Sequence, residues 1–162
     1  MKILYLDFDG VLHPDAVLSQ RKGTLAVMKE PGHSLFENAP VLEQLLRSYQ
    51  DVRIVLNTSW AWHFGCETAK RWLPQALQER VIGCTEEVVR GFRVAHKGIH
   101  VAEDMKTRQP SAWVAIDNEG FGWTDAQRSH LVLCDDVQGL GKPETRLEVA
   151  AAFNRNFGPP RC

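Results

Sequence analysis

The sequence contains no apolar run that approaches the roughly 20 residues needed to cross a bilayer. Its N-terminus also lacks an apolar stretch followed by a small-residue cleavage site, which a secretory signal would show. The 162 residues carry a formal net charge of -1, so no overall basic field favours nucleic acid or an anionic membrane surface. From these absences we expect a cytoplasmic protein with no membrane partner, in which a polyanion could bind only through a local patch.

Cysteine is also scarce, with four residues in the chain. Cys66, Cys84, Cys134 and Cys162 show no paired C-x-x-C spacing, so a zinc site is not expected. Scattered cysteines in a chain of this size are typical of a reducing compartment. We therefore expect no disulfide framework, and we expect Cys66, Cys84 and Cys134 to act as small apolar core residues.

The composition that is present is ordinary. Hydrophobic residues make up 44% and charged residues 24% of the chain, which, with the length, predicts a single domain spanning residues 1–162. Apolar runs alternate with helical patterns, and this predicts an α/β fold: a three-layer, Rossmann-like α/β/α arrangement with a central parallel sheet of about five strands. The expected strands cover residues 3–6, 52–56, 80–84, 112–116 and 130–134.

The expected helices begin with one that Pro40 opens, because the missing N–H of proline costs nothing at that position. The later helices cover residues 65–79, with a break near Pro74, then 97–105 and 143–153. In the last of them we expect four residues to face the core: Leu147, Val149, Ala150 and Phe153.

The most informative segment is the end of the first predicted strand. Residues 3–6 form a continuous apolar run, which is typical of a strand buried on both faces, and Asp7-Phe8-Asp9-Gly10 follows. In an extended chain Asp7 and Asp9 point to the same side, and Gly10 permits a turn. Two carboxylates at the carboxyl end of a central strand lie where open α/β sheets bind ligands, and they need a cation between them.

Polar residues also follow other predicted strands. Thr58 and Ser59 follow the second strand, Asp117 ends the fourth, and Lys97 lies at the start of the helix before that fourth strand. Mg²⁺ takes oxygen ligands, and phosphoryl oxygens are bound by cations and hydroxyl donors. Carboxylates, a hydroxyl and an ammonium at one edge of the sheet therefore predict a site for Mg²⁺ and a phosphoryl group.

This set of residues resembles the motifs of the haloacid dehalogenase (HAD) superfamily of phosphatases and phosphotransferases. Asp7-Phe-Asp9-Gly10-Val-Leu is similar to the first motif, and Ile54-Val-Leu-Asn-Thr58-Ser is similar to the second. Lys97 suits the third motif, and Val114-Ala-Ile-Asp117 suits the fourth. The four segments follow the order of the family across residues 3–119.

The resemblance implies a Mg²⁺-dependent phosphomonoesterase that forms an aspartyl-phosphate. Asp7 would be the nucleophile, and Asp9 would protonate the leaving alcohol and then activate water. Asp7, the backbone carbonyl of Asp9 and Asp117 would hold Mg²⁺, while Thr58 would bind the phosphoryl oxygens and Lys97 would offset their charge. The chemistry agrees, because a carboxylate attacks a phosphate only when cations offset the repulsion between the two anions.

The fourth motif departs from the family pattern, in which two adjacent acids are common. Here Asn118 follows Asp117, which suggests weaker Mg²⁺ binding, with Glu119 as a compensating carboxylate. Asn118 can still hydrogen-bond a metal-bound water. Asp135 and Asp136 come too late in the chain for the fourth motif, and we interpret them as a strand-end or turn feature.

Both places where HAD enzymes commonly carry a cap are short in this chain. Residues 13–38 leave room for a hairpin flap with a strand at residues 24–28, and residues 85–96 are too few for a cap. The chain therefore resembles a capless member, whose open site suits a bulky phosphorylated substrate such as a polymer end or a phosphoprotein, and also admits a small phosphoester. Its short length and the Thr58-Ser59-Trp60 segment also resemble small HAD domains linked to nucleic-acid repair proteins.

Several residues near these motifs have two interpretations. We expect Gly10, Ser59 and Trp60 to line the substrate site together with Thr58 and Lys97. Trp60 could stack on a base or a leaving group, although packing in the core is the commoner role for a tryptophan. His13 could point into the site, but we expect it to be a capping or solvated residue.

Two other functions are left open by the sequence. A response-regulator receiver domain also arranges acids, a threonine and a lysine around Mg²⁺, but its phosphorylated Asp ends the third strand, where this chain has Cys84-Thr85. A non-catalytic interaction module on a degenerate HAD scaffold is the second alternative, and only Asn118 favours it. Arg90, Arg93 and His96 form a small basic cluster that we interpret as a solvated loop, with phosphate recruitment as the alternative.

Overall fold

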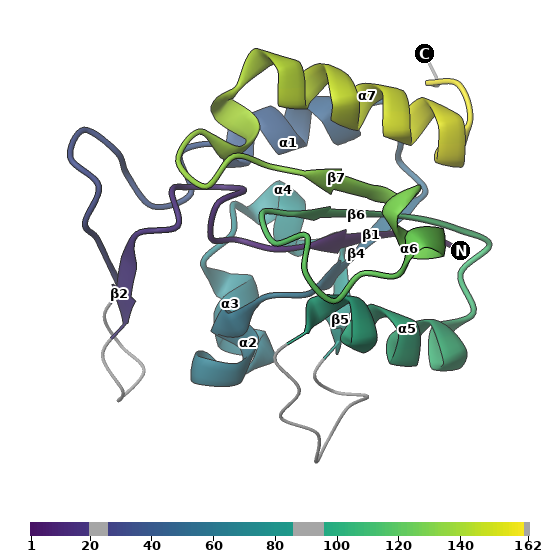
Figure 1. Cartoon of the computed structure of the whole chain (residues 1–162), viewed down its shortest axis with the longest axis horizontal. Coiled ribbons are helices and arrows are strands. Elements are labelled where there is room, and N and C mark those ends of the chain that lie inside the picture. Colours follow the sequence, from purple (N-terminus) through teal and green to yellow (C-terminus); the bar gives the residue numbers. More distant parts are fainter. Residues whose placement is uncertain (20–25, 86–95, 161–162) are drawn as a thin grey trace.

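The computed structural model describes residues 1–19, 26–85 and 96–160 of the chain. Its centre is a five-stranded sheet in the order β5-β4-β1-β6-β7, in which all neighbouring strands are parallel (Figure 1). The strands are β1 (Lys2–Leu6), β4 (Val52–Leu56), β5 (Val81–Cys84), β6 (Ala112–Asp117) and β7 (Leu131–Leu133). All five strands of the sequence analysis are present, with closely matching ends.

Helices cover both faces of this sheet. α1 (Ala39–Leu46) and α7 (Pro143–Phe157) pack on one face, and α5 (Lys97–Arg108) packs on the other (Figure 1). The shorter helical segments are α2 (Ser59–Phe64), α3 (Cys66–Arg71), α4 (Gln75–Gln78), α6 (Asp125–Arg128) and the 3₁₀ turn η2 (Gly139–Gly141). The predicted three-layer α/β/α fold is confirmed. No helix formed by the described residues is long and apolar enough to cross a membrane.

The apolar run of β1 explains why this strand lies in the middle of the sheet. Leu4 and Leu6 point into the core beneath α1 and α7, whereas Ile3 and Tyr5 point into the core beneath α5. All four side chains are fully buried. A strand with both faces covered must be apolar at every position, so the first polar residue, Asp7, marks its end.

The register of the sheet brings the predicted motifs to one edge. Leu6 lies opposite Leu56 on β4 and opposite Ile116 on β6. The residues that follow these three, which include Asp7 and Asp117, therefore lie at the same level at the carboxyl edge. In an open parallel sheet this edge is where ligands bind.

The segment after β1 contains a small antiparallel sheet. β2 (Val17–Ser19) pairs with β3 (Ala26–Met28), and Figure 1 shows this pair standing away from the central sheet. β3 corresponds to the strand expected at residues 24–28, of which residues 24 and 25 lie outside the described part of the chain. The division of the chain into one domain with a flap at residues 13–38 stays a prediction.

The expectation of unpaired cysteines is wrong for two of them. Cys66, at the start of α3, forms a disulfide with Cys84, at the end of β5, across a sequence separation of 18 residues. The packing of α3 beside β5 creates this pair, and no spacing motif in the sequence marks it. Cys134 is a buried free thiol, as expected. The cysteine argument for a cytoplasmic location therefore loses its support, and the location stays a prediction.

Two helical features differ from the sequence analysis. The helix α2, directly after the second motif, was not predicted. The core face of α7 includes Val149 and Phe153 as expected, but Leu147 is 72% exposed and Ala150 is not among the buried residues of the helix. The helical repeat of 3.6 residues instead places Thr145, Val149, Ala152, Phe153 and Phe157 on the buried side.

Candidate functional site

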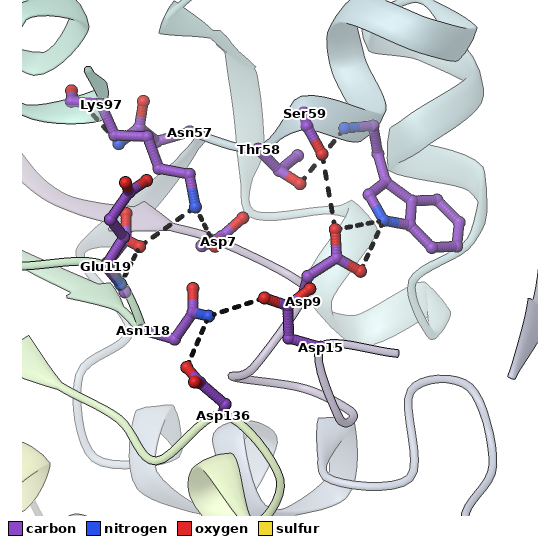
Figure 2. Close-up of polar contacts among 12 residues, drawn as sticks. Asp7, Asp9, Asp15, Asn57, Thr58, Ser59, Lys97, Asn118, Glu119 and Asp136 are labelled. Carbon is purple, nitrogen blue, oxygen red and sulfur yellow. Dashed lines mark hydrogen bonds and ion pairs between the residues drawn. The ribbon is translucent and has the colours of Figure 1, made fainter. Parts of the chain in front are cut away.

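Three residues of the predicted site meet at the carboxyl edge of the sheet. The Nζ atom of Lys97, the first residue of α5, forms ion pairs with Asp7 Oδ2 and with Asp117 Oδ1, the latter at 3.1 Å. Asp117 Oδ1 also accepts a hydrogen bond from the backbone N–H of Glu119 at 2.9 Å. Figure 2 shows the Lys97 ammonium beside Asp7. One ammonium thus holds two carboxylates that are almost fully buried.

The remaining oxygens of these two carboxylates lack partners. Asp7 Oδ1 and Asp117 Oδ2 are buried and accept no hydrogen bond from the described residues. A buried polar atom without a partner costs free energy, and such atoms in folded proteins call for a physical reason. Two orphaned carboxylate oxygens on neighbouring strands are what a bound cation would satisfy.

The electrostatics of the cluster agree with a missing positive charge. Burial raises the pKa of Asp7 to about 8, although Lys97 acts in the opposite direction. Burial raises the pKa of Asp117 as well, again against the effect of Lys97. Burial lowers the pKa of Lys97, but Asp7 and Asp117 outweigh this effect and raise it. The ammonium is therefore firmly protonated, yet it does not balance two buried carboxylates by itself.

The donor set fits Mg²⁺. The described residues contain no group of three or more His, Cys, Asp or Glu side chains placed to hold a metal ion. Mg²⁺ does not require such a group, because it usually binds through one or two carboxylates and keeps several waters. Asp7, Asp117 and the backbone carbonyl of Asp9 are the residues that would hold it.

Binding of Mg²⁺ should depend on pH, and thermal unfolding can measure this. Because the pKa of Asp7 is raised to about 8, the folded metal-free chain holds a proton that the unfolded chain releases above its ordinary pKa of about 4. The free energy of unfolding of the metal-free chain should therefore fall as the pH rises through this window. Mg²⁺ competes with that proton, so it should raise Tm more at about pH 8 than at about pH 5.

The control for this measurement is Asp117→Asn, which removes one proposed ligand and keeps the shape of the side chain. This variant should lose most of the Mg²⁺-dependent rise in Tm at about pH 8. A rise of equal size at both pH values, or one that survives in Asp117→Asn, would contradict a Mg²⁺ site at these carboxylates.

The second motif shapes the neighbouring wall of the site. Thr58 caps the N-terminus of α2, since its Oγ1 accepts a hydrogen bond from the backbone N–H of Trp60 at 3.4 Å. Among the described residues the Thr58 hydroxyl donates no hydrogen bond, so its hydrogen can be donated to a group bound in the site. Asn57, which the sequence analysis did not single out, accepts a hydrogen bond from Thr85 at 3.0 Å and donates to the backbone carbonyl of Lys97 at 3.5 Å. It therefore helps to place the start of α5.

Two glycines permit close approaches around the site. Gly10 has a φ of +68°, and a Cβ atom there would lie 2.5 Å from the Asn118 side chain. Gly10 thus makes room for Asn118, in addition to permitting the turn. At Gly98 a Cβ atom would lie 2.7 Å from the carbonyl oxygen of Gly122. Because Gly98 has no Cβ atom, the start of α5 can lie close to the loop after β6, and Lys97 therefore lies next to Asp117.

Asn118 connects two acids rather than binding at the Lys97 cluster. Its Nδ2 donates to Asp15 Oδ2 at 3.2 Å and to Asp136 Oδ1 at 3.0 Å (Figure 2). Asp135 caps a turn through the N–H groups of residues 137 and 138, as a strand-end residue should. Asp136, by contrast, reaches the site. Its position at the carboxyl end of the strand beside β6 is the signal that could have marked it.

An open pocket of about 540 Å³ lies in front of these residues. Its lining includes Asp9, Ser59 and Lys97, together with the acids Asp15, Asp136 and Glu119 and the ring of Phe121. Phe121 is 68% exposed at this pocket. A smaller pocket of about 170 Å³ extends past Thr58 and Lys97 to the half-exposed Trp62. The exposed rings of Trp62 and Phe121 thus lie at the two pockets beside the Lys97 cluster.

Two expectations about single residues are corrected. Trp60 is 3% exposed and packs among aromatic rings, so its ring offers no face to a substrate. His13 is fully buried, because its ring lies between Phe36 and Trp60, and it is not solvated. Both side chains instead form hydrogen bonds with Asp9. Arg90 and Arg93 of the predicted basic cluster lie outside the described residues.

Comparison with known proteins agrees with this geometry. A model of the family described as the HAD domain in Swiss Army Knife RNA repair proteins matches residues 3–145. That range includes all four motif positions and nearly the whole central sheet. Comparisons with curated proteins and with solved structures gave no match. The match covers most of the chain, and the protein therefore belongs to the HAD superfamily, in the family of HAD domains found in Swiss Army Knife RNA repair proteins.

Proposed function

We propose that the chain is a Mg²⁺-dependent phosphomonoesterase that works through a phosphorylated Asp7. The observation that supports this most is the pair of buried carboxylates at the carboxyl ends of β1 and β6, each with one oxygen held by Lys97 and one without a partner among the described residues. Family membership supports a hydrolase of the HAD type. Bound Mg²⁺ would supply positive charge that offsets the repulsion between the phosphoryl oxygens and Asp7.

In the first step an Asp7 oxygen attacks phosphorus, and the bond from phosphorus to the leaving oxygen breaks. The leaving oxygen takes a proton from the Asp9 carboxyl group, so an alcohol departs and Asp9 becomes a carboxylate. Lys97 stays protonated and offsets the charge of Asp7 and of the phosphoryl group. Thr58 donates its hydroxyl hydrogen to a phosphoryl oxygen.

In the second step Asp9 accepts a proton from a water molecule as the water oxygen attacks phosphorus. The bond between Asp7 and phosphorus breaks, inorganic phosphate leaves, and Asp9 is again protonated. Splitting one difficult displacement into two steps is the general advantage of a covalent intermediate. Turnover of 4-nitrophenyl phosphate that requires Mg²⁺ tests this function, and a folded protein without turnover would favour the non-catalytic alternative.

We further propose that the substrate is a phosphate on a large group, such as the end of a nucleic acid. Two features support this: the open pocket beside Asp9 and a family described from RNA repair proteins. The exposed rings of Trp62 and Phe121 lie at the two pockets next to Lys97. An aromatic side chain that stacks on a base contributes about 1–3 kcal/mol.

This substrate proposal predicts a preference that kinetics can measure. For a phosphate at the end of an oligonucleotide, kcat/KM should exceed that for the matching mononucleotide by ~10-fold or more. Trp62→Ala and Phe121→Ala should reduce this preference. Leu147→Ala is the matched control, because Leu147 is an exposed apolar residue on α7. A mononucleotide or another small phosphoester that outperforms every macromolecular substrate would contradict the proposal.

A further inference from the structure

The carboxylate of Asp9 is held by three side chains from two parts of the chain. The indole Nε1–H of Trp60 donates to both Asp9 oxygens at 3.1 Å. His13 Nε2 lies 3.1 Å from Asp9 Oδ1, and Ser59 Oγ lies 3.4 Å from Oδ2. The Asp9 side chain is 20% exposed, whereas the His13 side chain is fully buried. Asp9 thus faces the pocket, while His13 and Trp60 lie beneath it.

The hydrogen-bond partners of His13 determine which of its nitrogens carries the proton. His13 Nδ1 accepts a hydrogen bond from the backbone N–H of Phe36 at 3.1 Å. A backbone N–H can only donate, so Nδ1 has no proton and a neutral ring carries its proton on Nε2. His13 therefore donates to Asp9 Oδ1, and it does so from a fixed position because the Phe36 backbone holds the other side of the ring.

Trp60 is held equally firmly. Its ring is surrounded by five others, with ring centroids 5.3–5.8 Å away: His13, Phe8, Phe36, Phe64 and Trp72. A buried indole N–H needs an acceptor, and Asp9 supplies it. The packing therefore fixes the position of the indole N–H, and this N–H in turn fixes the orientation of the Asp9 carboxylate. This differs from an exposed hydrogen bond, in which both side chains can move away.

The three donors leave the two Asp9 oxygens in different situations. Oδ1 faces the N–H groups of His13 and Trp60, and neither of these can accept a proton. Oδ2 shares the Trp60 N–H with Oδ1 at the same distance of 3.1 Å, but the other partner of Oδ2 is the Ser59 hydroxyl, which can donate or accept. A proton on Oδ2 can therefore be accommodated, because Ser59 can turn from donor to acceptor. A proton on Oδ1 would meet two N–H donors.

We propose that Trp60 and His13 are positioning residues. The N–H of Trp60, shared by both oxygens, fixes the orientation of the Asp9 carboxylate, and the N–H of His13 keeps Oδ1 as an acceptor, which leaves Oδ2 as the oxygen that gives and takes the proton. This inference rests on the proposed function. The two residues do not touch the substrate in this scheme. They act by placing one carboxylate oxygen, and a displacement of about 1 Å at such a group can cost ~10²-fold in rate.

Trp60→Phe tests the proposal, because it keeps an aromatic ring and removes the N–H donor. The readout is kcat/KM, which reports on the steps up to formation of the phosphorylated enzyme. For an alkyl phosphate, whose leaving oxygen needs a proton, kcat/KM should fall ~10–100-fold. For 4-nitrophenyl phosphate, whose leaving group needs none, it should change less than about threefold. A loss of equal size on both substrates would indicate a structural effect and overturn the proposal.

Trp72→Phe is the matched control, because Trp72 packs in the same cluster without a hydrogen bond to Asp9 among those of the described residues. Any change in kcat/KM that Trp72→Phe causes should be of the same size for the alkyl phosphate and for 4-nitrophenyl phosphate. If it shows the same leaving-group dependence as Trp60→Phe, the effect comes from the cluster and the proposal fails.

Two His13 variants give an independent test if Trp60→Phe does not fold. His13→Gln places an amide N–H near the position of Nε2, whereas His13→Asn places an acceptor for the Phe36 N–H but does not reach Asp9. On the alkyl phosphate, His13→Gln should retain ~10-fold more kcat/KM than His13→Asn. Equal values would overturn the role of His13.

The same measurements separate this inference from the proposed function. If the unaltered protein does not hydrolyse 4-nitrophenyl phosphate, the proposed function fails and the positioning role fails with it. If the unaltered protein is active and kcat/KM of the variants falls equally for both substrates, the proposed function stands and only the positioning role is overturned.

Discussion

Replacing Asp7 with asparagine is expected to lower kcat/KM by about 10⁴-fold or more, because an amide cannot attack phosphorus in place of the carboxylate. Asp7 directly follows β1 with 1% of its surface exposed, and asparagine has nearly the same shape. Lys97 keeps its ion pair with Asp117 in the variant. The fold should therefore survive, and kcat/KM for 4-nitrophenyl phosphate measures the loss.

Stability offers a second readout for the same variant. Burial raises the pKa of Asp7 to about 8, so at neutral pH the metal-free chain must take up a proton at Asp7 as it folds, and this lowers its free energy of unfolding. Asp7→Asn should then leave Tm unchanged or raise it when Mg²⁺ is absent. It should also abolish labelling of the peptide that contains Asp7 with one phosphoryl group after rapid acid quenching.

Asp125→Asn is the matched control for this experiment. Asp125 lies in the first turn of α6 and is exposed, so the variant makes the same change in charge outside the site. Its kcat/KM should stay close to that of the unaltered protein. Near-normal activity of Asp7→Asn, with correct folding shown by its circular dichroism, would contradict a covalent mechanism.

The sequence predicted the sheet well because its inner strands β1, β4 and β6 are largely buried on both faces. Residues 3–6 and 52–56 are almost uninterrupted apolar runs, and runs this short, bounded by polar residues, are typical of buried strands. The polar residues that follow each run lie at the ligand-binding edge for the same reason. Asp7, Thr58 and Asp117 could therefore be placed near one another without coordinates.

The features that the sequence did not predict depend on contacts between distant segments. The disulfide between Cys66 and Cys84 follows from the packing of α3 against β5, which no spacing motif encodes. The link from Asn118 to Asp136 requires β7 to lie beside β6 in the correct register. For Trp60 the sequence offered a choice between substrate contact and core packing, and the structure shows why that choice was too narrow. Its ring packs in the core while its single N–H reaches Asp9.

Replacing Asp9 with asparagine should lower kcat/KM for an alkyl phosphate by ~10²–10⁴-fold, the usual contribution of a general acid. The hydrogen bonds around Asp9 indicate that folding should be unaffected. An asparagine Oδ1 can accept from His13 and Trp60 as the carboxylate does, and its amide group can donate to Ser59. The amide nitrogen that takes the place of Oδ2 cannot accept from Trp60, so the variant loses one of the two contacts of that N–H. It keeps the other hydrogen bonds and loses the exchangeable proton.

A comparison of substrates with different leaving groups shows whether this loss of kcat/KM comes from proton transfer. For 4-nitrophenyl phosphate, kcat/KM of Asp9→Asn should fall much less, because the phenolate departs without a proton. The second step still lacks its base, so kcat should fall on both substrates and the phosphorylated form of Asp7 should accumulate. Asp125→Asn, tested beside it, should show none of these changes. If Asp9→Asn hydrolysed the alkyl phosphate as fast as the unaltered protein, Asp9 would not be the acid, and the hydrogen bonds from Trp60 and His13 would serve only the fold.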